Sequence, residues 1–207
     1  MKKIKTAILI SGRGSNMKAL IEASKDKNFP AEICLVISNK KDASGLEYAK
    51  KENIKTLVIS HKEFKTREEF DDNLTKSIKE NDCEIICLAG FMRILSDKFT
   101  KTWHNKALNI HPSLLPAFKG NDAVGDAIKM GAKFSGCTVH LLTSEMDSGP
   151  IIMQSRVEIS SDDNKETLAA KILIKEHEIY PKCLRILCES IQNNKNLDQY
   201  LQLVNLA

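Results

Sequence analysis

The sequence Asn109-Ile110-His111-Pro112-Ser113-Leu114-Leu115-Pro116 decides how we interpret the fold. It continues a short apolar run at 107–110, which predicts a buried strand. Residues at i and i+2 of a strand face the same side, so Asn109 and His111 should point into one cleft. Pro112 removes a backbone donor and places His111 at the strand's end, where open α/β sheets bind ligands. Taken alone, the octapeptide fits an ordinary histidine at a strand terminus equally well.

The whole sequence has the size and composition of one globular domain. It has 207 residues, of which 42% are hydrophobic and 28% charged, and we assign residues 1–207 to a single domain. The net charge of +4 comes from scattered lysines, which argues against a nucleic-acid surface. No apolar run is long enough to span a membrane, and no signal cleavage site follows the first strand, so we expect a cytoplasmic protein.

The cysteines and histidines do not form a metal-binding pattern. The six cysteines include no C-x-x-C pair, so we expect reduced thiols that act as small apolar residues. The segment Glu176-His177-Glu178 lacks a second ligand at i+4. We therefore predict that no metal is bound.

Short apolar runs alternate with helical periodicity through the first half of the chain. Strands are predicted at 7–10, 33–37, 57–59, 85–88 and 107–110, with helices beginning near Met17 and spanning 43–51 and 67–80. Such alternation predicts right-handed βαβ crossovers. The fold class is therefore α/β, with an open, mainly parallel twisted sheet of Rossmann-like type and helices on both faces.

After Pro116 the pattern changes. A short helix is predicted near 122–130, followed by strands at 138–142 and 151–157 that should pair with each other as an antiparallel pair. The apolar spacing from Asn164 to about Ser190 predicts one long helix, which we expect to be interrupted at Pro181.

The loop Ser11-Gly12-Arg13-Gly14-Ser15-Asn16 lies between the first strand and its helix. Free backbone N–H groups and the positive helix end make such a loop suited to an anion. It matches neither G-x-G-x-x-G nor a Walker loop. The loop thus predicts a phosphate or carboxylate site, and a purely structural turn is the alternative.

Two further segments could complete a site. Ala89 to Leu95 ends the fourth strand and is mostly apolar, so it could line a slot for a flat heterocycle or simply belong to the core. Asp147 lies in a loop between two strands. Loop carboxylates usually form turns, but this loop could fold back over the fifth strand, where Asp147 would orient the ring of His111.

Three motifs together resemble the 10-formyltetrahydrofolate-dependent formyltransferases. These are AGFMRIL at 89–95, NIHPSLLP at 109–116 and MDSGPII at 146–152, in family order and spacing. The sequence SGRGSN at 11–16 narrows the resemblance to the glycinamide ribonucleotide branch of purine biosynthesis. The similarity extends from the first strand to Tyr180-Pro181.

The resemblance implies transfer of a formyl group from 10-formyltetrahydrofolate to the primary amine of glycinamide ribonucleotide. The substrates would be small molecules, with no nucleic acid or membrane partner, and the protein would be a monomer or homodimer. The implied catalytic residues are Asn109, His111 and Asp147. Those implied to contact the ribonucleotide are Gly14, Ser15, Asn16, Arg67 and Glu176. Those implied to hold the folate are Met92, Arg93, Ile94, Leu95 and Asn109.

Other functions remain open from the sequence. Formyltetrahydrofolate hydrolases and methionyl-tRNA formyltransferases share the Asn/His/Asp set, but they usually carry a further domain before or after it, for which we find no sequence. A non-enzymatic nucleotide-binding module would need Asn109, His111 and Asp147 to lie apart in space. The distance between the His111 ring and the Asp147 carboxylate therefore distinguishes the module from the enzymes.

Overall fold

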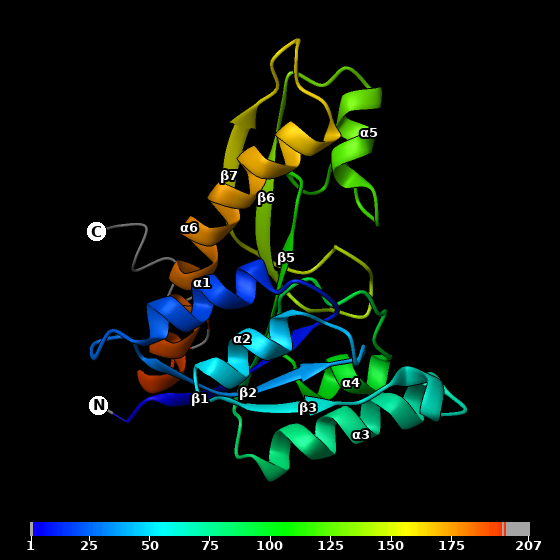
Figure 1. Cartoon of the computed structure of the whole chain (residues 1–207). Helices are drawn as coiled ribbons and strands as arrows, with labels where there is room; N and C mark the ends of the chain where they lie inside the picture. The colour runs from blue at the N-terminus through cyan, green and yellow to red at the C-terminus, as the bar shows by residue number, and fades with distance from the viewer. Residues whose placement is uncertain (1, 196, 198–207) are drawn as a thin grey trace.

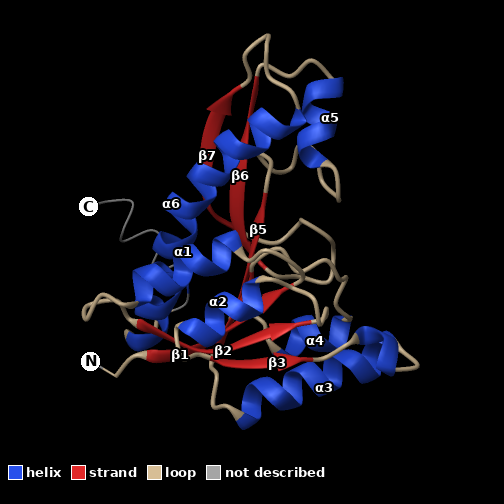
Figure 2. Ribbon diagram, in the orientation of Figure 1, coloured by secondary structure: helices blue, strands red, loops and turns tan. Residues whose placement is uncertain are grey.

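A computed structural model describes residues 2–195 and 197, and this part of the chain contains a seven-stranded sheet (Figures 1 and 2). The strand order is β3-β2-β1-β4-β5-β6-β7. The strands are β1 (Ile4–Ile10), β2 (Ala31–Ser38), β3 (Lys55–Val58), β4 (Ile85–Leu88), β5 (Ala107–His111), β6 (Phe134–Leu141) and β7 (Ile151–Glu158). The first five are parallel, and β6 runs antiparallel to both β5 and β7. The predicted fold class and the antiparallel pair are confirmed.

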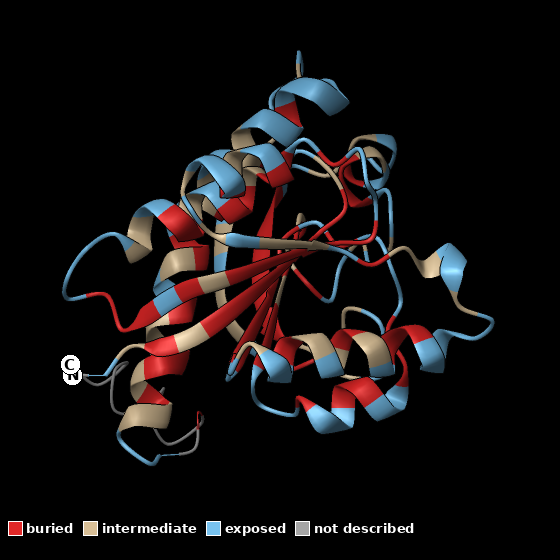
Figure 3. Ribbon diagram, turned by 60° about the horizontal axis from the view of Figure 1, so that its bottom comes forward, coloured by how far each residue is buried: buried red, intermediate tan, exposed pale blue. Residues whose placement is uncertain are grey.

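Helices cover both faces of the sheet, as Figure 3 shows in a second view. The helices are α1 (Ser15–Ser24), α2 (Gly45–Lys51), α3 (Arg67–Glu80), α4 (Asp97–Thr102), α5 (Ala123–Lys129) and α6 (Lys165–Gln192), with a 3₁₀ turn at His61–Glu63. Successive residues of a strand face opposite sides. Ile8 therefore packs in the core under α1, α2, α5 and α6, while Leu9 packs in the core under α3 and α4. No helix of the described ranges is long and apolar enough to cross a membrane.

Strand β1 lies between β2 and β4 and is the point at which the strand order switches from one side of the sheet to the other. The chain builds one side of the sheet as β1, β2, β3 and then returns to add β4 and β5 on the other side. The connections on either side of this point diverge, and they leave a crevice at the carboxyl ends of the strands. The loops that follow β1, β4 and β5 meet there (Figure 1).

Helix α6 is continuous through Pro181, so the predicted interruption is wrong. Proline cannot donate the hydrogen bond that an interior helical residue normally makes. The neighbouring turns are held by tertiary packing instead, because Tyr180 is fully buried and its hydroxyl donates toward the carbonyl oxygens of Leu88 at 2.9 Å and Leu108 at 3.2 Å. Anchorage to the strands β4 and β5 thus offsets the lost helical hydrogen bond.

Removing the Tyr180 hydroxyl is expected to weaken this anchorage. In Tyr180→Phe, two buried carbonyl groups lose a donor, and the free energy of unfolding should fall by about 1 to 3 kcal/mol. Tyr48→Phe is the matched control, because the Tyr48 hydroxyl donates to Glu22 at the exposed surface and its loss should cost no more than about 0.5 kcal/mol. Urea unfolding of both variants measures the difference. Equal changes would show that the buried contact does not stabilise α6.

Candidate active site

A cleft of about 690 Å³ opens at the carboxyl ends of β1, β4 and β5. The loop between β6 and β7 lies against it and contributes Asp147. All but one of the residues predicted to bind or react line this single cleft. They are Ser15, Asn16, Arg67, Met92, Arg93, Ile94, Leu95, Asn109, His111, Asp147 and Glu176.

Gly14 is the predicted residue that does not line the cleft. It precedes α1 with a φ of 68°, a left-handed conformation that glycine adopts without strain. A Cβ here would lie 3.0 Å from the Cε of Met17 and 3.3 Å from the Cα of Gly45. Gly14 therefore shapes the turn and lets α1 begin close to α2.

The structure brings His111 and Asp147 together. The Nδ1 atom of His111 lies 3.4 Å from Oδ2 of Asp147, and the two side chains are only 7% and 10% exposed. The other ring nitrogen, Nε2, lies 2.8 Å from the carbonyl oxygen of Phe118. Asp147 also accepts a hydrogen bond from the Gly120 N–H at 3.0 Å. One carboxylate thus orients the histidine and fixes the loop that follows β5.

The side chain of Asn109 is oriented by His140. The two residues lie opposite each other in the β5–β6 ladder. Nδ1 of His140 lies 2.9 Å from the carbonyl oxygen of Leu141, which can only accept, and burial lowers the pKa of His140. Nε2 is therefore the unprotonated nitrogen, and it accepts from the Asn109 Nδ2 at 3.2 Å. His140 therefore supports the site from behind.

One end of the cleft is built from the glycine loop and α6. Asn16 donates from Nδ2 to Oε2 of Glu176 at 2.7 Å, although the two residues lie 160 positions apart in the sequence. Burial raises the pKa of Glu176. The Oδ1 atom of Asn16 is buried without a hydrogen-bond partner among the described residues. Arg13, which the sequence analysis did not select, is exposed and lines this end.

The other end of the cleft is the segment after β4. All four apolar residues line the cleft, but Met92 and Ile94 are 67% and 57% exposed, whereas Phe91 and Leu95 are buried and pack in the core under α3 and α4. The alternative that all four are core residues is therefore wrong for Met92 and Ile94. Exposed apolar side chains that line a cleft suit a flat ring.

A buried serine holds this segment in place. The Oγ atom of Ser11 accepts from the Met92 N–H at 2.8 Å and donates to Oδ1 of Asn39 at 2.6 Å, while its backbone N–H donates to Gly90 at 3.2 Å. Ser11 is also the first residue of the glycine loop. The two ends of the cleft are thus joined through one side chain that the sequence analysis did not select.

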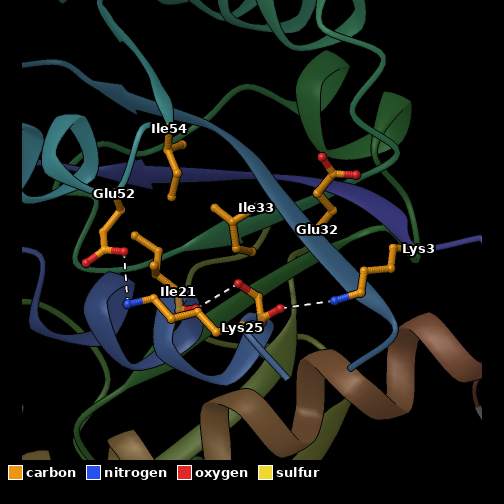
Figure 4. Close-up of a pocket in the computed structure, with 8 residues that line it drawn as sticks. Lys3, Ile21, Lys25, Glu32, Ile33, Glu52 and Ile54 are labelled. Atoms are coloured by element: carbon orange, nitrogen blue, oxygen red, sulfur yellow. Dashed lines mark hydrogen bonds and ion pairs between the residues drawn. The ribbon is translucent and has the colours of Figure 1, made fainter. Parts of the chain in front are cut away.

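A smaller hollow of about 200 Å³ lies between α1 and β2 (Figure 4). Lys25 pairs there with Glu52 at 2.9 Å, and the Lys3 ammonium donates to the carbonyl oxygen of Ser24 at 3.1 Å. Both ammonium groups already have partners, so the described lining of this hollow offers no free cation to an anionic ligand. The cleft at the strand ends is the stronger candidate site.

The fold and the cleft define an α/β protein in which Asn109, His111 and Asp147 lie between a glycine loop and a mostly apolar segment. The family model for formyl transferases matches residues 4–184. The chain therefore belongs to the formyl transferase family. This agrees with the resemblance carried by the three sequence motifs.

Relatives with known names support a more specific comparison. The chain is 40% identical to phosphoribosylglycinamide formyltransferase of Haemophilus influenzae, over 97% of this chain and 94% of the relative. It is 44% identical to the human trifunctional purine biosynthetic protein adenosine-3, but it spans only 19% of that protein's length. The crystal structure of glycinamide ribonucleotide transformylase 1 from Symbiobacterium toebii superposes with a TM-score of 0.89, at 38% identity, covering 91% of this chain and 89% of the other.

Proposed function

We propose that this chain transfers the formyl group of 10-formyltetrahydrofolate to the primary amine of glycinamide ribonucleotide, a step of purine biosynthesis. The observation that carries the proposal is the assembly of Asn109, His111 and Asp147 in one cleft, with the His111 ring 3.4 Å from the Asp147 carboxylate. This distance argues against the non-enzymatic module. The named relatives of similar length support the choice of substrates.

The two substrates would enter from opposite ends of the cleft. The loop carrying Ser15 and Asn16 would hold the phosphate of the ribonucleotide, and Arg67 and Glu176 would contact the rest of it. Met92, Arg93, Ile94 and Leu95 would hold the pterin of the folate. The formyl carbon and the attacking amine would then meet beside Asn109, and holding them there converts a bimolecular step into an intramolecular one.

Attack of the amine places negative charge on the formyl oxygen. The amide N–H of Asn109 and a protonated His111 are suited to stabilise this oxyanion, and such a donor typically contributes about 100- to 1,000-fold in rate. Because the Asn109 amide already donates to His140, the side chain of Asn109 is oriented before the substrate arrives. Asp147 would hold the His111 ring and help a water molecule relay the proton from the attacking amine.

The hydrogen bond from His111 to Phe118 adds one requirement. Nε2 of His111 now lies 2.8 Å from the Phe118 carbonyl oxygen, and Asp147 faces Nδ1. For His111 to reach the oxyanion through Nε2, the formyl oxygen must replace the Phe118 carbonyl as acceptor. The loop carrying Phe118 would therefore shift when the folate binds.

A direct assay tests the proposal. The protein is mixed with 10-formyltetrahydrofolate and glycinamide ribonucleotide, and tetrahydrofolate release is followed by absorbance. A parallel sample without the ribonucleotide separates transfer from hydrolysis, and a His111→Ala sample controls for uncatalysed reaction. Release that depends on both substrates and on His111 supports the proposal. Release without the ribonucleotide would indicate a hydrolase, and no release would reject both enzymes.

Glu176→Gln should separate stability from binding. The buried carboxylate has a raised pKa, so its ionised form costs folding free energy above that pKa. The neutral glutamine can still accept from Asn16, and we expect the variant to be more stable than the wild type near neutral pH. This difference should shrink as the pH falls below the raised pKa of Glu176 and disappear below the ordinary pKa of a glutamate, because the side chain is then neutral in both the folded and the unfolded chain.

Glu176→Gln should also bind the ribonucleotide about 10- to 100-fold more weakly, because the charge-assisted hydrogen bond from the ribonucleotide to the Glu176 carboxylate would be lost. Urea unfolding at several pH values and calorimetric titration measure the two effects. Folate binding is the internal control and should change little. A variant less stable than the wild type at neutral pH would contradict the stability part, and unchanged ribonucleotide affinity would contradict the binding part.

A further inference from the structure

Two cysteines lie side by side at the end of the sheet remote from the cleft. Cys34 belongs to β2 and Cys83 lies just before β4, so the pair reaches across the first half of β1. In the β1–β2 ladder, Thr6 pairs with Ile33 and Ala7 with Leu35, which leaves Cys34 as the extra residue of a bulge. Bulges redirect a side chain, and here the thiol of Cys34 reaches toward Cys83.

The two sulfur atoms are in direct contact. Their separation is 3.0 Å, and each thiol also lies 3.7 Å from a backbone carbonyl oxygen, that of Thr6 for Cys34 and that of Asn81 for Cys83. Cys34 is partly exposed, whereas Cys83 is 5% exposed. The hydrogen bond between them lowers the pKa of Cys34 and raises that of Cys83. Cys34 is therefore the thiol that an external reagent would meet first, in its more reactive form.

The other four cysteines have a different environment. Cys87, Cys137, Cys183 and Cys188 are all fully buried. Burial also raises the pKa of each of these thiols. They serve as unreactive references within the same chain.

We propose that Cys34 and Cys83 form a dithiol site that is oxidised to an intramolecular disulfide by a small-molecule disulfide. The thiolate of Cys34 attacks one sulfur of the reagent RS–SR, forms a mixed disulfide and releases RS⁻. Cys83 then loses its proton, attacks the Cys34 sulfur and releases the second RS⁻. The two cysteines are oxidised by two electrons, and RS–SR is reduced to two thiols.

The bond would close a loop between residues 49 positions apart in the sequence. That loop contains α2, β3 and α3, and constraining it lowers the entropy of the unfolded chain. The melting temperature should rise by about 5 to 15 °C. Because Cys34 lies beside the first half of β1 and the cleft lies at the carboxyl ends of the strands, the bond should stabilise the fold and leave the rate of formyl transfer unchanged. The disulfide itself does not depend on the proposed reaction.

Oxidised glutathione is the probe. The folded, reduced protein is incubated with it, denatured, and titrated for free thiols, which should fall from six to four. Peptide mapping should identify the 34–83 cross-link, and dithiothreitol should reverse both the link and the rise in melting temperature. Six remaining thiols, or a link between other cysteines, would overturn the proposal.

Two single variants test the order of the steps. In Cys83→Ala, glutathione should remain attached to Cys34, because no second thiol is present to displace it. In Cys34→Ala, Cys83 should stay unmodified, because it is shielded and its pKa is raised. Neither variant should show the reversible rise in melting temperature. Modification of Cys83 in Cys34→Ala at the wild-type rate would overturn the assignment of Cys34 as the attacking thiol.

Discussion

Replacing Asp147 by asparagine is expected to lower the rate of formyl transfer by about 100- to 10,000-fold, with little change in folate affinity. The asparagine side chain can still accept from the Gly120 N–H, so the loop should keep its position. The amide is neutral, however, and can no longer stabilise a protonated His111 ring 3.4 Å away. The loss should therefore fall on the chemical step, and single-turnover kinetics with saturating substrates would measure it.

Glu145→Gln provides the matched control for this experiment. Glu145 lies in the same loop, but its side chain is 79% exposed and pairs with Lys119 at 3.8 Å. Its neutralisation should change the single-turnover rate by less than about threefold, because surface ion pairs contribute little. If Asp147→Asn reacted at the wild-type rate, or if both variants lost activity equally, the assigned role of Asp147 would be wrong.

Most of the fold could be predicted because its elements are encoded by local patterns. The strand β4 is the apolar run at 85–88, and α3 spans Arg67–Glu80, which is the range predicted for this helix. Helix α4 was not predicted because it is only six residues long. Its N-cap, Ser96, is fixed by a tertiary contact, since its N–H donates to the buried carboxylate of Asp71 at 2.6 Å. Pro181 was misjudged for the same reason, because contacts to distant strands hold α6 together.

Residues that line the cleft with their side chains could be predicted from the sequence. Residues that contribute a backbone group could not. Asn109 and His111 share a strand face, and this spacing is visible in the sequence. The carbonyl of Phe118 accepts from His111, but every residue carries a carbonyl, so no sequence signal marks it. The role of Ser11 depends on the approach of β1 to the segment after β4, which is set by strand order and not by any local pattern.

Removal of the phosphate from glycinamide ribonucleotide is expected to weaken binding by at least about 100-fold, or about 2.7 kcal/mol. The glycine loop lies at the start of the ten-residue helix α1, where free N–H groups and the helix dipole favour an anion. Ser15 and Asn16 line the cleft there, beside the exposed guanidinium of Arg13. Charge-assisted hydrogen bonds from such a loop are stronger than neutral ones.

Two variants locate the phosphate within the cleft. Arg13→Ala should weaken binding of the ribonucleotide about 10- to 150-fold and leave the affinity for the dephosphorylated compound nearly unchanged, since a hydrogen bond to a charged group contributes about 1.5 to 3 kcal/mol. Lys18→Ala is the control, because Lys18 lies near the start of α1, close in sequence to the glycine loop, but its ammonium lies 5.0 Å from the centre of the Tyr48 ring. Calorimetric titration gives the dissociation constant of each compound. The constant of the dephosphorylated compound divided by that of the ribonucleotide should fall in Arg13→Ala and stay unchanged in Lys18→Ala. Because phosphate is the only difference between the compounds, equal affinity for both in the wild type would place the anion elsewhere and reduce the glycine loop to a structural turn.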